Sequence, residues 1–217
     1  MDELRKIYAD KRVGEHFEFG RYPQGADGEI KPILWRVLQR VIHPVSWRTT
    51  WRMLKREKEY LLILAEQGLD SKPYHEKFCG ITWAECSLRR WLNAAFYNRA
   101  FNDQERALIL QTYVINNAGP DTADHVFLLS INDAKRLFAD DAARQAVPTD
   151  FALEKGARTS ADFNIGNIGC CCWWWLRSRG IYDDLAADVG TDGGVYEAGS
   201  DVNDDFGCVR PALRIAL

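Results

Sequence analysis

The sequence predicts a single α+β domain in which mixed or antiparallel sheets are combined with two or more helices. The chain has 217 residues, of which 47% are hydrophobic and 12% aromatic, so it can bury one sizeable core. Apolar runs of strand length are separated by turn residues, and several other segments carry helix-capping signals. No stretch rich in Pro, Gly or Ser is long enough to divide the chain into separate domains.

Composition and charge exclude several classes of protein. A chain with so many aromatic residues collapses in water, which excludes a disordered protein. No stretch approaches the ~18 apolar residues that a membrane-spanning helix needs, so no membrane span is expected. With 28 basic and 31 acidic residues, the net charge of -3 gives no general attraction to nucleic acid. The first six residues lack the apolar segment of a Sec signal, which predicts a protein made in the cytoplasm.

Three strands are expected in the N-terminal part of the chain. His16 to Phe19 and Ile33 to Val41 have strand-like patterns, and the segment between them contains Pro23 and glycines that indicate a turn. Tyr60 to Ala65 is a short apolar run with the length of a buried strand. These segments predict the first part of a sheet.

The segment from His43 to Lys58 is basic and contains Trp47 and Trp51. A basic stretch with aromatic residues is one pattern of nucleic-acid contact. A solvated hairpin or loop whose tryptophans pack inward has the same pattern. Because the chain as a whole is acidic, we favour the hairpin or loop and expect no nucleic-acid partner.

Capping signals predict the first helices. Thr82, with Glu85 three residues later, has the pattern of a capping box, and apolar residues follow at helical spacing as far as Phe96. A second short helix is expected from Asn102, with Glu105 at the boxed position, toward Leu110.

A further strand and two helical segments follow in the sequence. Val126 to Leu129 has the pattern of a strand, and Ser130 after it can cap a helix that carries Leu137 and Phe138. Thr149 to Lys155 is expected to form one or two helical turns. The helices are therefore short and lie between strands.

Three consecutive tryptophans stand in the C-terminal region, defined here as residues 170–217 after a scaffold of residues 1–169. The apolar run that contains them has strand length, so Trp173 and Trp175 share one face while Trp174 takes the other. A core strand is the favoured interpretation, and a stacking platform for a ligand is the alternative. The last segment, Cys208 to Leu217, is again strand-like and is expected to close the sheet.

Between these strands the pattern changes. Small or apolar residues recur every two to five positions and can fix short strands and turns. The residues between them mix aromatic, acidic, amide and aliphatic types without periodicity, so they are expected to project from that frame. These residues are Ile181, Tyr182, Asp183, Asp184, Leu185, Asp188, Asp192, Tyr196, Ser200, Asp201, Asn203, Asp204, Asp205 and Phe206. Together with Cys208 they are called the contact set below.

Motifs of common catalytic chemistry are missing from the sequence. It has no phosphate-binding loop, no nucleophile elbow and no zinc-protease helix. Its four histidines are scattered, and its six cysteines lack zinc-ligand spacing, so free thiols, no metal and no cofactor are expected. The aspartates of the C-terminal region have the atoms for calcium but not the EF-hand spacing, so solvated turn residues are the favoured interpretation. The sequence therefore predicts a protein without enzymatic activity.

Seven blocks of the sequence resemble those of a bacterial and phage domain family. The blocks occur in order along nearly the whole chain: Phe19–Gln24, Pro32–Leu38, Lys72–Tyr74, Ser87–Asn93, Val126–Ser130, Trp174–Ser178 and Val209–Leu213. Members of this kind are often the variable proteins of diversity-generating retroelements. The C-terminal region resembles their mutable part. The resemblance implies a C-type lectin fold of the formylglycine-generating-enzyme type, as in phage tropism determinants.

This resemblance implies how the contact set arises and what it does. In such systems, adenines of Asn codons are randomised during reverse transcription, and nearly all of the contact set can arise in this way. So can Cys171 and Cys172, whereas Glu197 does not fit an Asn codon. The contact set, including Cys208, would then bind a protein or other macromolecule. Tyr182 and the other aromatic members are the strongest contact candidates, because aromatic residues offer large area with few rotatable bonds.

Two alternatives of other classes remain open at this point. One is an oxidase related to formylglycine-generating enzymes, which would use the thiols of the C-terminal region and a metal. The other is a calcium-dependent carbohydrate-binding lectin. A cytoplasmic or virion-associated location agrees with the resemblance, and the sequence specifies neither the ligand nor the oligomeric state.

Overall fold

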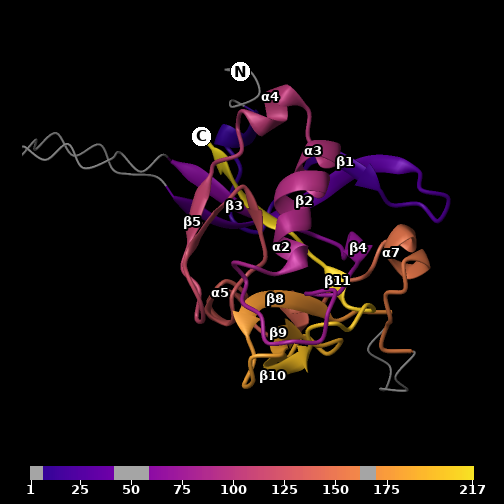
Figure 1. The fold of residues 1–217 in the computed structure, drawn as a ribbon. Helices are drawn as coiled ribbons and strands as arrows, with labels where there is room; N and C mark the ends of the chain where they lie inside the picture. Colours follow the sequence, from indigo (N-terminus) through magenta and orange to yellow (C-terminus); the bar gives the residue numbers. More distant parts are fainter. Residues whose placement is uncertain (1–6, 42–58, 162–169) are drawn as a thin grey trace, which may run out of the picture.

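The computed structural model describes residues 7–41, 59–161 and 170–217, which form an α+β domain built mostly of antiparallel strands (Figure 1). The first sheet has five antiparallel strands in the spatial order β1, β2, β3, β12 and β7. Their bounds are β1 (His16–Pro23), β2 (Ile30–Val41), β3 (Tyr60–Ala65), β12 (Ala212–Ala216) and β7 (Val126–Phe127). The predicted α+β class, with antiparallel sheets in one domain, is confirmed.

The second sheet carries most of the C-terminal region. Its spatial order is β10, β9, β8, β11 and β4, and it lies at the end of the molecule opposite to the C-terminus (Figure 1). Its strands are β10 (Val195–Asp201), β9 (Leu185–Val189), β8 (Trp174–Arg179), β11 (Cys208–Val209) and β4 (Asp70–Ser71). Strand β11 runs parallel to β8, and the other pairs are antiparallel. A separate hairpin consists of β5 (Thr112–Val114) and β6 (Thr122–Asp124).

The helices are short. They are α2 (Ser87–Trp91), the π-helical turn η1 (Leu92–Phe96), α3 (Tyr97–Ala100), α4 (Asp103–Arg106), α5 (Ile131–Arg136), α6 (Asp141–Arg144) and α7 (Asp150–Glu154). Helices of one or two turns have little stability of their own, so packing against the sheets holds them in place.

The strands predicted for the N-terminal part are confirmed, with longer bounds. Strand β1 continues beyond Phe19 to Pro23, and β2 begins at Ile30 rather than at Ile33. The extra residues of the two strands still pair, and a register irregularity between Glu18 and Arg21 separates the two halves of the ladder. A turn with glycines between the predicted strands could not reveal how far pairing continues toward it.

Two capping predictions are confirmed and one is wrong. Helices α4 and α5 begin with complete capping boxes at Asn102 and Ser130, although α4 ends at Arg106, short of Leu110. The predicted box at Thr82 does not form, because helix α2 begins only at Ser87. The thiol of Cys86 takes the capping role there and accepts from the backbone N–H of Arg89 at 3.3 Å. Helix α7 is confirmed, with Thr149 as its cap.

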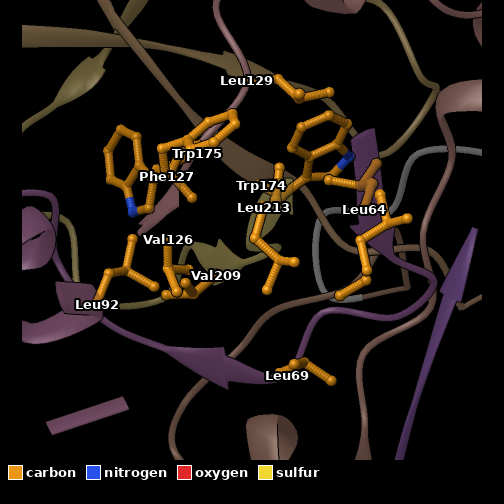
Figure 2. Close-up of a cluster of buried hydrophobic side chains, with 14 of the residues drawn as sticks. Leu64, Leu69, Leu92, Val126, Phe127, Leu129, Trp174, Trp175, Val209 and Leu213 are labelled. Atoms are coloured by element: carbon orange, nitrogen blue, oxygen red, sulfur yellow. The ribbon is translucent and has the colours of Figure 1, made fainter. Parts of the chain in front are cut away.

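The tryptophans of β8 lie in a core that both sheets share. Trp174 and Trp175 are fully buried, and Figure 2 shows them in one cluster with Phe127 and Leu213 of the first sheet. The rings of Trp173 and Trp175 lie 4.6 Å apart, which confirms that these two share a face. Their indole N–H groups have partners, because Trp174 donates to a carbonyl of Arg144 and Trp175 to one of Lys72. The core-strand interpretation therefore holds for Trp174 and Trp175.

The last segment joins the two sheets instead of forming one strand. Its first part, β11, lies in the second sheet, and its second part, β12, lies between β3 and β7 in the first. The chain changes sheet at Arg210, whose guanidinium is fully buried and donates to the carbonyls of Ala65 and Arg144 at 2.8 and 2.9 Å. A buried cation bonded in this way fixes the crossing.

The basic segment from His43 to Lys58, with its expected hairpin or loop, lies entirely outside the described residues. Within the ranges that the structure describes, none of the helices is long and apolar enough to cross a membrane.

Candidate ligand-binding surface on strands β9 and β10

An open cavity of about 420 Å³ lies over strands β9 and β10. Its polar and aromatic lining comes from four parts of the C-terminal region: the residue before β8, the two strands, the turn between them, and the loop after β10. Apart from Thr191 of the turn, these side chains are Trp173, Asp188, Tyr196, Ser200, Asp204 and Phe206. All except Trp173 belong to the contact set, so tertiary structure brings five of its members around one cavity.

Strand alternation explains which side chains of β10 reach the cavity. Tyr196, Ala198 and Ser200 line it, at every second position of the strand. Glu197 lies between them and forms an ion pair with Lys135 of helix α5. The one residue of this strand that does not fit the predicted pattern of variation therefore contacts the scaffold.

The backbone of the turn between β9 and β10 is fixed by contacts with helix α6. Gly193 has φ of +83°, and a Cβ there would come within 1.8 Å of the carbonyl oxygen of Asp141, so only glycine fits. The buried guanidinium of Arg144 donates to the carbonyl of the same glycine at 2.8 Å. The turn that places Asp192 and Tyr196 is thus fixed by backbone contacts and by a scaffold arginine.

Two aromatic rings form one wall of the cavity. Trp173 is 6% exposed, and its ring meets that of Phe206 edge to face at 5.6 Å between centroids. The guanidinium of Arg158 lies 4.5 Å from the centre of the Phe206 ring. Of the three consecutive tryptophans, Trp173 is therefore the one that reaches a surface, which the sequence pattern alone left open.

The carboxyl group of Asp188 is the most unusual group in the cavity. It is 5% exposed, and its Oδ2 accepts from the Ser200 hydroxyl at 3.0 Å. Burial, opposed by the Ser200 hydrogen bond and assisted by the charges of Asp204 and Asp192, raises the pKa of Asp188 to about 7. Asp188 therefore changes charge near neutral pH.

The remaining aspartates of the cavity reinforce its acidic character. Burial, followed by the charges of Asp201 and Asp205, raises the pKa of Asp204. Asp192 accepts from the Tyr196 hydroxyl at 3.0 Å and from the backbone N–H of Gly194 at 2.9 Å. The cavity thus combines aromatic rings with acidic groups.

A second group of the contact set lies at the turn between β8 and β9. Ile181 and Tyr182 are 62% and 65% exposed. The backbone of this turn is fixed, because the carbonyl of Asp183 accepts from Ile81 and the carbonyl of Asp184 accepts from Val202. The backbone is thus determined by the fold while the side chains of Ile181 and Tyr182 extend into solvent.

Thirteen of the fifteen members of the contact set are exposed or half-buried. Asp188 and Cys208 are the exceptions. Asp188 still lines the cavity, but Cys208 is fully buried beside Trp173 and Gly68, so its side chain is not available to a ligand. Cys171 and Cys172 are buried as well. These thiols stand where strands pack, and a position in a packed core tolerates few side chains.

The six cysteines are free thiols, as expected. A hydrogen bond with Cys172, together with burial, raises the pKa of the Cys208 thiol well above its usual value. Reactive cysteines have a lowered pKa, because the thiolate is the nucleophile. This pair therefore has the properties of core residues.

Sequence reasoning missed four contributors to the surface. Ala198 and Gly199 line the cavity through strand geometry, and Gly190 and Thr191 line it from the turn. Their residue types carry no signal of a binding role, and only the register of β9 and β10 places them there. Among the described residues, no group of three or more His, Cys, Asp or Glu side chains is placed to hold a metal ion.

A larger cavity, of about 610 Å³, lies between the β5–β6 hairpin, helix α5 and strand β8. Arg177 lines it and is already bound, to Asp133 at 2.9 Å and to the carbonyl of Leu128 at 2.8 Å. No member of the contact set lines this cavity. The contact set and this cavity are therefore separate features.

Comparison with known proteins identifies one family. Residues 58–217 match the model of a domain of unknown function, DUF6273. The matched range includes the strands that line both cavities and every residue of the contact set. No curated protein and no solved structure matches the chain. Since the matched residues make up well over half of the sequence, the chain belongs to the DUF6273 family.

Proposed function

We propose that this protein is a non-enzymatic ligand-binding protein whose C-terminal region is diversified by a retroelement. In this proposal the scaffold is a C-type lectin fold, and the contact set without Cys208 binds a protein or other macromolecular ligand. A formylglycine-generating-enzyme-like oxidase and a calcium-dependent lectin are the alternatives, and no contact among the described residues favours either.

The observation that carries the proposal is that buried residues, which hold the strands together, lie between exposed members of the contact set within the C-terminal region. Ala186, Ala187, Val189 and Val202 are fully buried between exposed members of the contact set. Burying such side chains stabilises the sheet, whereas the side chains between them make few contacts that the fold requires. The same segment therefore has a constant interior and a replaceable surface.

The energetics of substitution agree with this division. Substitutions on a surface usually change stability by less than ~0.5 kcal/mol, whereas truncations in a core cost several kcal/mol. A protein that presents many different side chains must confine them to the first kind of position. Thirteen of the fifteen contact-set positions meet that condition.

A library experiment tests the proposal directly. Five exposed positions, Tyr182, Tyr196, Asp201, Asn203 and Asp205, are randomised together in the full chain with the codon NNC. A matched library randomises five buried frame positions, Ala186, Ala187, Val189, Val202 and Cys208. Protease resistance of the displayed chains measures the folded fraction.

We expect most members of the first library to remain protease-resistant and few members of the second to do so. Selection of the first library against a panel of proteins should then yield binders with different side chains at these positions. Equal loss of folding in both libraries would show that the fold depends on the exposed positions and would contradict the proposal.

The diversification part has its own test in the genome. A reverse-transcriptase gene and a near-identical copy of the segment encoding the C-terminal region are expected beside this gene, with differences concentrated at adenines. A complete genomic neighbourhood without such a copy would remove the retroelement and leave only the binding surface.

A further inference from the structure

We propose that the cavity over β9 and β10 is a subsite for a basic side chain, arginine or lysine, of a protein ligand. This inference rests on the proposed ligand-binding function and names the chemistry of one contact within it. It is carried by the combination of aromatic rings and carboxyl groups in one concave site.

The charge of the lining is the first argument. Asp188 and Asp204 line the cavity, and Asp192 lies next to it through its bond with Tyr196. Among the described residues that line it there is no Lys, Arg or His. Arg158 lies outside this lining, against Phe206, and its charge acts on Asp204 by lowering the pKa of that carboxyl group. Arg158 thus offsets part of the negative charge, and the two lining aspartates with Asp192 still leave the described lining acidic, so that it attracts a cation.

The aromatic wall is the second argument. A cation over the face of an aromatic ring is attracted by the negative charge of that face, and tryptophan is the strongest partner. Trp173, Phe206 and Tyr196 contribute three rings to this cavity. An acidic group framed by such rings matches the alkyl stem and the charged end of a lysine or arginine side chain.

Asp188 gives the third argument, which concerns its bonding. Asp188 is 5% exposed and lines the cavity, and its Oδ2 accepts from the Ser200 hydroxyl at 3.0 Å. The charged form of so enclosed a carboxyl group is costly, because burial removes water from the charge and the nearby Asp204 and Asp192 repel it. The guanidinium or ammonium group of a ligand supplies hydrogen-bond donors and the compensating charge.

Proton linkage follows from this geometry. The groups that act on Asp188 are the hydroxyl of Ser200 and the carboxyl groups of Asp204 and Asp192, and Tyr196 lies opposite it on β10. A cation favours the charged form of Asp188. With a pKa of about 7 in the free protein, binding is therefore accompanied by loss of a proton, and affinity rises as the pH increases from 6 to 8.

The experiment uses the full chain and four small probes. Acetyl-arginine amide and acetyl-lysine amide carry the proposed cations, and acetyl-citrulline amide and Nε-acetylated acetyl-lysine amide are their neutral counterparts. Changes in the backbone NMR signals of Gly190, Thr191 and Gly199 report binding at the cavity itself. The titrations are repeated at pH 6, 7 and 8.

We expect saturable binding of at least one cationic probe, with its neutral counterpart at least tenfold weaker. The affinity should increase severalfold between pH 6 and pH 8, because Asp188 loses its proton over this range. Asp188→Asn should abolish this pH dependence and weaken binding at pH 8. Asp204→Asn, a second variant on the cavity wall, should weaken binding and retain a pH dependence that is shifted to lower pH, because the charge of Asp204 raises the pKa of Asp188.

Asp103→Asn is the matched control, because Asp103 lies on α4 far from β10 (Figure 1) and its side chain is 96% exposed. It should leave both the affinity and its pH dependence unchanged. Equal binding of cationic and neutral probes, or no localised signal change with any probe, would overturn the subsite. Such a result would leave the library experiment on exposed positions unaffected, so the two proposals fail separately.

Discussion

A single buried carboxyl group, that of Asp188, lies beneath the candidate ligand-binding surface on β9 and β10. Asp188 occupies a position of β9 that pairs with Trp175 on one side and Tyr196 on the other. Its neighbours in sequence, Ala187 and Val189, are core residues. An apolar residue at this position would stabilise the strand, so the carboxyl group is an energetic cost that a binding role would explain.

Stability should therefore depend on the protonation of Asp188. Its pKa is about 7 in the folded protein and ~3.9 in an unfolded chain, so the folded state binds the proton more tightly between these values. The free energy of unfolding contributed by this group is greatest below pH ~4 and decreases as the pH rises to 7, by up to about 4 kcal/mol. Asp188→Asn lacks this decrease.

The measurement is the melting temperature of the wild type and of Asp188→Asn at pH 5, 6, 7 and 8. The variant should gain stability relative to the wild type with each step in pH. A constant difference over this range would show that Asp188 does not titrate there.

At the scale of elements, strand β10 depends on one irregularity. Its register with β9 shifts between Tyr196 and Ser200, and Gly199 within this interval has φ of +84°. A Cβ on this glycine would lie 2.6 Å from the carbonyl oxygen of Ala186. The irregularity gives the strand its bend, and β-bulges often re-aim side chains beside functional sites. In this strand it places Ser200 over Asp188.

Gly199→Ala should destabilise the protein for two reasons, the positive φ and the backbone clash. Gly28→Ala is the matched control, because Gly28 has φ of +77° but nothing within 4 Å of a Cβ. We expect a loss of ~1 kcal/mol for Gly28→Ala and of at least ~2 kcal/mol for Gly199→Ala, measured by urea denaturation. Equal losses would mean that β10 shifts to accept the methyl group.

At the scale of the whole molecule, the last segment makes the two sheets interdependent. Strand β12 pairs with β3 and β7 in the first sheet, and β11 pairs with β8 and β4 in the second. Trp174 of the second sheet lies beside Leu64 and Leu213 of the first sheet in the shared core (Figure 2). The candidate surface thus rests on the scaffold's own core and is not an appended module.

Unfolding should therefore be cooperative across both sheets. In native-state hydrogen exchange, the slowest amides of β3 and those of β9 should report the same free energy of opening, because neither sheet keeps its core without the other. A markedly lower opening energy for β9 would show that the second sheet unfolds independently.

The sequence by itself determined the local structure. Alternating and apolar runs specify β1, β3 and the tryptophan strand, since a strand needs only its own side-chain pattern to choose a face. The capping boxes at Asn102 and Ser130 specify α4 and α5 in the same way. Thr82 failed as a cap because Cys86 offered a second acceptor closer to the apolar turn, and a capping pattern does not show which acceptor forms the bond.

Only the tertiary structure decided which side chains share a surface. The sequence predicted correctly that most of the contact set is not buried, yet it could not show that Cys208 is buried or that Trp173 is the tryptophan that reaches the cavity. Nor could it show that Asp188 is enclosed. Burial and proximity depend on strands brought together from distant parts of the chain, and the pKa of a carboxyl group follows from that enclosure, because the loss of water around the charge is a property of the assembled fold.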